Sequence, residues 1–228
     1  MEELLDFFRR LDANNNRAWF DEHRGEWMRV KRSITRLTEE LIAGISMIDP
    51  AVHGVRPQDC TFRIARDTRF SKDKSPYKNW LGIYVAPRGK NSGYAGYYLH
   101  IAPNEDRLIG QHMLVSGLYC PEPVVLRSVR EEILDHGDEM QRQIEAAAAH
   151  GYALDRSNSL KRTPVGFPAG TPHDELLRLK DIYLSKPLSE EFLLADHLAE
   201  RVVEALRPTV PFVEQINRAV QYAYEEMQ

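Results

Sequence analysis

The stretch Tyr94-Ala95-Gly96-Tyr97-Tyr98-Leu99-His100-Ile101-Ala102 is typical of a β-strand, and the arrangement of the rest of the chain depends on it. Tyrosine and isoleucine are enriched in strands because they pack well on a pleated, half-buried surface. Since successive side chains of a strand point to opposite faces, Tyr98 and His100 should share one face of a sheet. Tyr97 and Leu99 should then lie on the other face.

Further strands are predicted on both sides of this one. From Asp59 to about Val115 the apolar residues recur with a period near two, in short runs separated by turn residues. The predicted strands lie near 60–66, 80–86, 94–102 and 107–115. Residues 88–93 and 103–106 form short links between the last three of them, and short links between successive strands favour antiparallel pairing.

Two amphipathic helices are predicted before the strands. The first carries apolar residues at steps of three and four, namely Leu4, Phe7, Phe8 and Leu11. Asn14-Asn15-Asn16 then favours a turn, in which one amide can cap the next helix. The second helix is long, because apolar residues repeat at helical spacing from Trp27 to Ile48, and Asp49-Pro50 ends it.

More helices are predicted after Pro121. Their expected starts are Pro123, Asp138, Thr171, Ser189 and a position shortly before Phe212. Gly137 suits the residue after a helix end, and Asp138 with Gln141 three positions later predicts a capping box at the start of the next helix. Helices at both ends of the chain predict an α+β fold. We expect a central, mainly antiparallel sheet of about four or more strands, flanked by N-terminal and C-terminal helices in a single domain of residues 1–228.

The composition is that of a globular protein. The 228 residues are 43% apolar and 28% charged, which is sufficient for a buried core. No apolar run approaches the ~20 residues that span a bilayer, and the N-terminus does not resemble a signal peptide. Cys60 and Cys120 form no CxxC pair, so neither a disulfide framework nor a thiolate metal site is expected. These features predict a cytoplasmic protein without a membrane partner.

Several familiar catalytic and binding motifs are absent from the sequence. The chain contains no HExxH, EF-hand, GxSxG, Walker A or GxGxxG pattern. We therefore expect no cofactor and no metal site.

A basic segment, Phe62–Lys78, is the strongest candidate for function. Its sequence FRIARDTRFSKDKSPYK holds six Lys or Arg residues and two Asp, whereas the whole chain holds 30 basic and 34 acidic residues. Cations this close repel one another unless acids or a bound anion compensate. The candidate ligand-binding residues are Arg63, Arg66, Arg69, Lys72, Lys74, Tyr77 and Lys78, together with Tyr98 of the central strand.

The chemistry of these residues favours an anionic small molecule as the partner. Arginine binds phosphate or carboxylate through two hydrogen bonds, and lysine binds it as a point charge. If the central strand lies near the basic segment, His100 or Asp67 could move a proton, which makes these two the candidate catalytic residues of a possible enzyme.

Two other interpretations remain open. The basic segment could be a protruding finger of a non-enzymatic module that binds nucleic acid or a protein, although the acidity of the whole chain makes nucleic acid a less favoured partner. Alternatively, its three arginines could be tied to its two aspartates and to carbonyl groups in a structural ion-pair network. Neither the choice among these functions nor the oligomeric state follows from the sequence.

The basic segment, followed by AGYYLHIAP, resembles the central signature of a bacterial and fungal family, domain of unknown function 2461. NNNRAWFDEHR near the start and LKRTPVGFPAGTPHDELLRLKDIYLS later on are similar to two other regions of that family, so the resemblance covers essentially the whole chain. The family implies no established activity. It places signature positions at Arg63, Arg66, Asp67, Arg69, Lys72, Asp73, Lys74, Tyr77 and Lys78.

Overall fold

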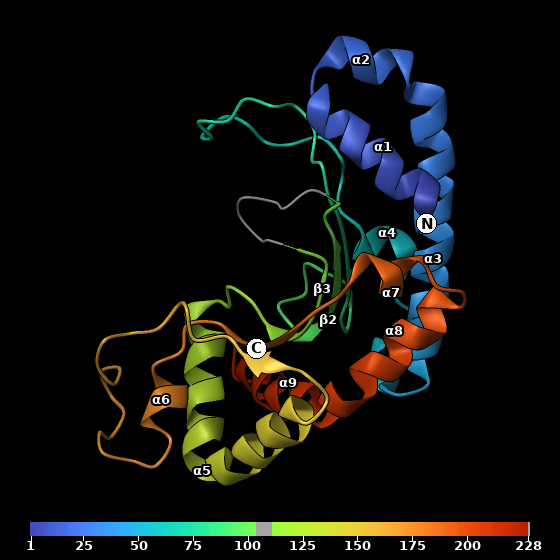
Figure 1. The fold of residues 1–228 in the computed structure, drawn as a ribbon. Helices are drawn as coiled ribbons and strands as arrows, with labels where there is room; N and C mark the ends of the chain where they lie inside the picture. The colour runs from blue at the N-terminus through green and yellow to red at the C-terminus, as the bar shows by residue number, and fades with distance from the viewer. Residues whose placement is uncertain (104–110, 228) are drawn as a thin grey trace.

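The computed structural model describes residues 1–103 and 111–227, and in them one antiparallel sheet is flanked by N-terminal and C-terminal helices (Figure 1). This confirms the predicted α+β fold. The five strands of the described residues follow the order β1-β2-β3-β5-β4 across the sheet. Their bounds are β1 Leu81–Val85, β2 Gly96–Ile101, β3 Met113–Leu118, β4 Ala153–Leu154 and β5 Ile182–Pro187.

The register of the sheet aligns the candidate residues with glycine and tyrosine on the neighbouring strand. On β1, Gly82 lies opposite His100 of β2, and Tyr84 lies opposite Tyr98. On the other side of β2, Tyr98 lies opposite Val115 of β3. All of these side chains belong to one face of the sheet, because directly paired residues of antiparallel strands point the same way.

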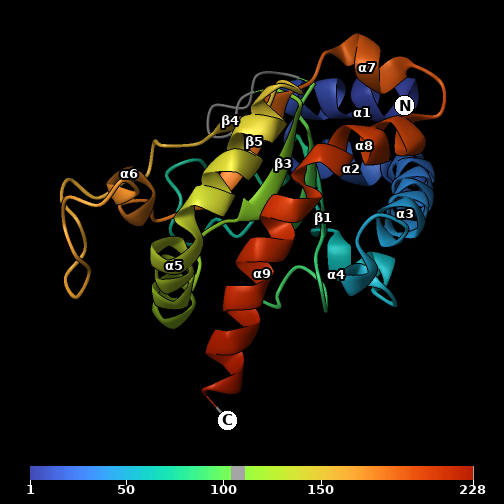
Figure 2. The same ribbon diagram turned by 90° about the horizontal axis from the view of Figure 1, so that it is seen from below.

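The opposite face of the sheet carries the core. Leu99 and Leu114 on this face are almost fully buried, whereas Tyr98 and Val115 on the other face are only partly buried. The hydroxyl of Tyr97 donates a 2.9 Å hydrogen bond to the buried Asp49 carboxylate, just beyond helix α3 (Arg24–Ser46). Figure 2 shows the helices that cover this face as a row in the order α5, α9, α8 and α3.

The N-terminal helices follow the predicted pattern closely. They are α1 Glu2–Ala13, α2 Arg17–Glu22 and α3 Arg24–Ser46, followed by the short turns η1 Pro50–Val52 and α4 Pro57–Cys60. Asn16 caps α2, since its side chain accepts the Trp19 N–H at 3.0 Å. Asp49 follows α3 and caps η1 by accepting the Ala51 N–H at 3.0 Å. The short helix α2 was not separated from α3 in the prediction.

The C-terminal helices begin near the predicted starts, except that the one beginning at Leu198 was predicted to continue the helix from Ser189, and no helix begins at Asp138. They are α5 Pro123–Ala148, α6 Asp174–Leu177, α7 Glu190–Leu194, α8 Leu198–Leu206, η2 Arg207–Thr209 and α9 Val210–Glu225. The boundary predicted at Gly137 is a kink within α5, where His136 leaves the helical conformation with φ −134° and ψ 29°. A side chain at Gly137 would overlap the ring of His173, which packs against the kink. Ser189 caps α7, as predicted, by accepting the Phe192 N–H at 3.1 Å.

The strand predicted near 60–66 is wrong. Pro57 starts the helical turn α4, and the residues after it make only two isolated bridges, Thr61 with Ile83 and Ala65 with Tyr77. The segment with this alternating pattern therefore does not form a strand of the sheet. It pairs instead with residues near Tyr77.

The other strand predictions agree with the structure in part. Strands β1 and β2 lie within the predicted 80–86 and 94–102, and β3 overlaps the end of the predicted 107–115. Residues 104–110, which include most of the predicted link and the start of that last strand, lie outside the described residues. Strands β4 and β5 were not predicted. Strand β4 has only two residues, and β5 lies between two helix starts and pairs with the distant strand β3.

Candidate functional site

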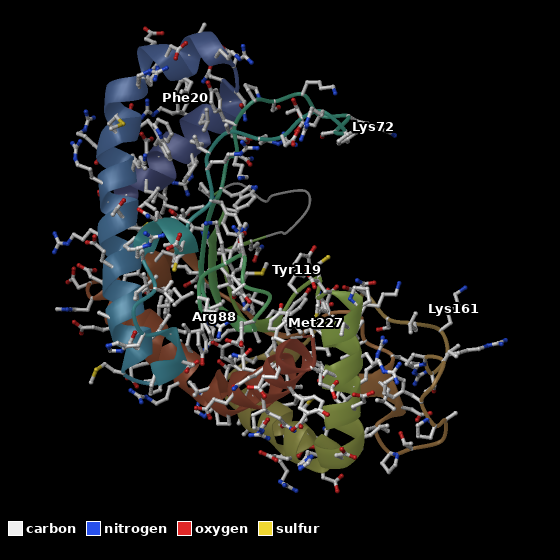
Figure 3. All side chains as sticks on the ribbon, turned by 180° about the vertical axis from the view of Figure 1, so that it is seen from behind. Phe20, Lys72, Arg88, Tyr119, Lys161 and Met227 are labelled. Carbon is white, nitrogen blue, oxygen red and sulfur yellow. The ribbon has the colours of Figure 1, made fainter. Side chains whose placement is uncertain are left out.

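The basic segment folds back on itself as a two-stranded ribbon, residues 62–78, which we call the basic ribbon. The Arg66 N–H donates to the Pro76 carbonyl at 2.8 Å, and the Lys78 N–H donates to the Ile64 carbonyl at 2.8 Å. Residues 67–75 form its tip. Figure 3 shows the ribbon projecting away from the sheet, with Lys72 at its tip.

The N-terminal helices hold the base of the basic ribbon in place. The amide of Asn15 donates to the Tyr77 carbonyl at 2.9 Å and accepts the Tyr77 N–H at 3.1 Å. The ring of Tyr77 stacks on Phe20 of α2, with 4.0 Å between the ring centroids and 19° between the planes. Tyr77 therefore joins the basic segment to the asparagine-rich turn, and this contact fixes where the ribbon leaves the molecule.

Two ion pairs organise the ribbon tip. Arg66 pairs with Asp73, and Arg69 pairs with Asp67 through Nη2 and Oδ2 at 2.7 Å. Asp73 also accepts hydrogen bonds from the side chain and backbone of Ser75, and these bonds together with Arg66 hold the pKa of Asp73 well below its usual range. Hydrogen bonds from Arg69 likewise lower the pKa of Asp67. Both carboxylates are thus ionised at neutral pH, and each offsets one arginine.

The other four cations of the basic ribbon have no carboxylate partner in the described part of the chain. Lys74 donates to the Thr68 carbonyl at 2.9 Å, and Lys78 donates to the Arg63 carbonyl at 2.6 Å. The side chains of Arg63 and Lys72 are exposed and form no hydrogen bond or ion pair with another described residue. The ribbon therefore retains a surplus of positive charge after its internal ion pairs are formed.

Lys78 occupies the most unusual environment of these cations. Its ammonium lies 5.3 Å from the ring centroid of Trp80 and 5.8 Å from that of Phe62. Burial lowers the pKa of Lys78, and the charges of Arg63 and Arg66 lower it further. A bound anion would oppose both effects, because a nearby negative charge stabilises the protonated amine.

Trp80 connects Lys78 to the histidine and tyrosine of β2. The Trp80 and His100 ring centroids are 5.3 Å apart, and the Tyr98 hydroxyl lies 2.9 Å from His100 Nδ1. Gly82 makes this approach possible, because a Cβ there would lie 2.6 Å from the Tyr98 hydroxyl oxygen. Lys78, Trp80, His100 and Tyr98 thus form a continuous row of contacts along the partly buried face of the sheet.

The structure brings together some of the predicted site residues and separates others. Lys78, at the base of the ribbon, belongs to the row that contains Tyr98 and His100, and Arg63 adjoins it there because its backbone carbonyl accepts a hydrogen bond from Lys78. The other predicted charged residues lie farther along the ribbon. Arg66 adjoins the tip, and the tip itself contains Asp67, Arg69, Lys72 and Lys74. The two candidate catalytic residues are therefore in different environments, with Asp67 exposed beside Arg69 and His100 fully buried.

Sequence reasoning did not identify Trp80 or Gly82 as part of the site. Both could have been found, because Lys78, Trp80, Gly82 and Tyr84 alternate along one extended segment and therefore share a face. The contact between Asn15 and Tyr77 had no such signal, since 62 positions separate the two residues.

Two further properties bear on the chemistry of the described residues. None of their helices is both long and apolar enough to cross a bilayer. No three of their His, Cys, Asp or Glu side chains are grouped so that they could hold a metal ion.

Fold and site together define an α+β protein whose antiparallel sheet is covered by helices on one face and carries an anchored basic ribbon at one end. The chain matches the model of the family described as conserved hypothetical protein (DUF2461) over residues 3–214, and it belongs to that family. No curated protein and no solved structure matches it.

Proposed function

We propose that this protein binds an anionic small molecule, either a phosphate ester or a carboxylate, at the base of the basic ribbon. The observation that supports this proposal is the position of Lys78, whose ammonium lies 5.3 Å from the ring centroid of Trp80 and donates to the backbone carbonyl of Arg63, the second cation of the ribbon base. Neither cation has a carboxylate partner among the described residues. Aromatic and cationic side chains side by side suit a ligand that combines a negative charge with a planar or apolar part.

The magnitude of the electrostatic attraction is sufficient for binding. At an effective dielectric constant of about 20, a cation about 4 Å from a unit anion stabilises it by about 4 kcal/mol before desolvation is counted. The structural-network interpretation is a weaker explanation of this region, because the side chains of Arg63 and Lys72 form no hydrogen bond or ion pair with another described residue.

The proposal is binding and not catalysis. The Asp67 carboxylate is engaged by Arg69, and its lowered pKa makes it a poor general base. His100 is fully buried and shares a hydrogen bond with Tyr98, so we assign this pair the role of supporting Trp80 from within the sheet.

Thermal denaturation with candidate ligands tests the proposal. Inorganic phosphate, a nucleotide, a sugar phosphate and a dicarboxylate would each be added to the purified protein. A ligand present at 100 times its dissociation constant stabilises the folded state by about 2.7 kcal/mol, which raises the melting temperature measurably. We expect a saturable rise from at least one of these anions.

Two matched variants show whether such a shift arises at the proposed site. Lys78→Met removes the ammonium and keeps an apolar stem of similar length, so it should abolish the ligand-induced shift. Lys186→Met is the control, because Lys186 also holds its ammonium over an aromatic ring, 5.7 Å from the centroid of Tyr152. Equal ligand-induced shifts in both variants would place the bound anion elsewhere.

We also propose a cytoplasmic location. Its support is that Cys60 and Cys120 are both free thiols, with Cys60 buried and Cys120 exposed. A reducing compartment preserves an exposed thiol. Fractionation of cells that express the protein would test this, and recovery with secreted proteins would contradict it.

A further inference from the structure

A second basic loop projects from the same side of the molecule as the basic ribbon. Residues 156–173, which we call the 156–173 loop, form the connection from β4 to α6 after Asp155, and they contain three basic residues and no acidic one. Arg156 pairs with Glu175, whereas Lys161 and Arg162 are exposed and form no ion pair within the described residues. Figures 1 and 3 show this loop and the ribbon tip extending in the same direction from opposite ends of the curved backbone.

The tip of the basic ribbon displays an aromatic ring. The side chain of Phe70 is 96% exposed, and the guanidinium of Arg69 lies 5.8 Å from its ring centroid. The ion pair between Arg69 and Asp67 and the turn from Thr68 to Ser71 hold this conformation. The ring is therefore presented to solvent by an ordered loop.

Two more exposed rings lie away from the tips of the loops. Phe62, at the ribbon base, is 42% exposed, and the ammonium groups of Lys78 and Lys90 lie 5.8 Å and 5.9 Å from its centroid. Tyr119, directly after β3, is 73% exposed. Figure 3 shows Tyr119 between the ribbon tip and the 156–173 loop.

The same two segments carry a surplus of positive charge, whereas the rest of the chain is acidic. The basic ribbon and the 156–173 loop together contain nine basic and two acidic residues, which leaves 21 basic and 32 acidic residues for the rest of the chain. The overall acidity, which argued against nucleic acid at the level of the sequence, is therefore a property of other regions.

We propose that this side of the protein binds a single-stranded polynucleotide. Cationic side chains of the two loops contact its phosphates, and unpaired bases stack on the exposed rings, namely Phe62, Phe70 and Tyr119. The proposal rests on the proposed function in one respect, since Arg63 and Lys78 would take a phosphodiester of the strand as their anion.

The positions of the rings favour this partner over a lipid surface. A flat bilayer would meet the tips of the loops, where Phe70 and the fully exposed Val165 are the apolar side chains. Phe62 and Tyr119 lie away from these tips, and a flexible single strand can reach them. A duplex keeps its base faces covered by stacking, whereas a single strand offers them to aromatic side chains.

Fluorescence anisotropy with labelled 20-nucleotide oligo-dT and oligo-U tests the proposal, and the two probes distinguish DNA from RNA. We expect saturable binding whose logarithmic affinity falls linearly with the logarithm of the salt concentration. The double variant Lys161→Gln/Arg162→Gln should reduce the magnitude of that slope by about 1.4, since each phosphate contact on a single strand contributes about 0.7.

Two exposed apolar positions provide a matched pair. Phe70→Ala should weaken oligonucleotide binding about tenfold, because it removes a stacking ring. Val165→Ala should leave the affinity unchanged, since valine offers no ring. Both side chains are exposed, so neither change should alter the melting temperature.

The outcomes separate this proposal from its alternatives. Absence of binding to both oligonucleotides by the folded protein would overturn it, and a phosphate-induced thermal shift that depends on Lys78 would then leave the small-ligand function standing. Oligonucleotide binding that depends on Phe70 but not on Lys78, together with no small-ligand shift, would support the polynucleotide site without its contact to Lys78 and would remove the small-ligand site. Equal losses in Phe70→Ala and Val165→Ala, with binding to phosphatidylserine vesicles, would reassign the surface to a membrane.

Discussion

At the scale of single residues, Gly82 controls the geometry of the candidate site. It is the position on β1 over which Tyr98 and Trp80 meet, and a Cβ there would lie 2.6 Å from the Tyr98 hydroxyl oxygen and 3.1 Å from a ring carbon of Trp80. The row from Lys78 to Tyr98 therefore depends on the absence of one side chain. Substitution here should disturb the site without touching any charged group.

Gly82→Ala should lower the free energy of unfolding by about 1–3 kcal/mol, because the added methyl group overpacks two rings. The control is Gly25→Ala, since a Cβ at this exposed helical glycine would meet nothing within 4 Å. That change should be neutral or stabilising by up to about 1 kcal/mol. Urea unfolding measures both, and equal stabilities of the two variants would contradict the close packing at Gly82.

At the scale of elements, the basic ribbon depends on its anchor in the N-terminal helices. The Asn15 side chain satisfies both backbone polar groups of Tyr77. The side chain of Asn14, its neighbour, donates to the carbonyl of Arg10 in the adjoining helix α1. The two asparagines are adjacent in the sequence, but only the Asn15 side chain connects the N-terminal helices to the basic ribbon.

Asn15→Ala should cost about 1–3 kcal/mol of stability, because two partly buried backbone groups lose their partner. It should also raise the rate of amide hydrogen exchange at Tyr77. Asn14→Ala, the matched control, should change the free energy of unfolding by less than about 0.5 kcal/mol. If amide exchange at Tyr77 were unchanged in Asn15→Ala, the anchor would have no role in ordering the ribbon.

The ribbon tip should respond to acid. The pKa values of Asp73 and Asp67 are lowered in the folded state, so their ion pairs contribute stability above the ordinary aspartate pKa of about 3.9 and lose it as the pH falls through the lowered values. The stability difference between the wild type and Asp73→Asn should therefore shrink as the pH falls below about 4. Urea unfolding at several pH values measures this difference, and a constant difference would show that Asp73 is not ionised in its pair with Arg66.

Local signals made the helices predictable, and distant contacts made the ribbon unpredictable. Asn16 and Ser189 act within a few residues of their own positions, so the caps they form could be read directly from the sequence. The segment near 60–66 has the alternation of a strand, yet its pairing partner is 76–78, and Asn15 and Phe20 set its direction from far away in the chain. Strand β5 was missed for the same reason, since it pairs with β3 and the helices α5 and α6 lie between the two strands in the sequence.

The candidate site shows the same division between local and distant information. Tyr98 and His100 were correctly placed on one face, because strand alternation is a local property. Which aspartate pairs with which arginine could not be predicted. Arg66 meets Asp73 only because the ribbon turns back between them.

At the scale of the whole molecule, the burial of a cysteine thiol and of tyrosine hydroxyls predicts that the folded state loses stability at alkaline pH. Burial raises the pKa of the Cys60 thiol to about 11, and it also raises the pKa values of Tyr84 and Tyr97. In the unfolded chain these groups lose their protons near their ordinary pKa values of about 8.5 for cysteine and about 10 for tyrosine. The stability they contribute is fully present below about pH 8.5 and decreases as the pH rises above it.

The free energy of unfolding, measured in urea from pH 8 to pH 11, should therefore fall across this range. The same burial should leave one rapidly reacting thiol in the native protein at pH 8, that of the exposed Cys120, and two after denaturation. Rapid reaction of both thiols in the native state would show that Cys60 is not enclosed by the core.

The segregation of charge also determines how the protein should behave on an ion-exchange column. With a formal net charge of −4, a protein whose charges were evenly mixed would pass through a cation exchanger at pH 7. Here the two basic loops offer that resin a positive surface, while the remaining surface suits an anion exchanger. We expect retention on both resins, and earlier elution of Lys161→Gln/Arg162→Gln from the cation exchanger alone. Passage of the wild type through the cation exchanger at low salt would mean that the nine basic residues do not act as one surface.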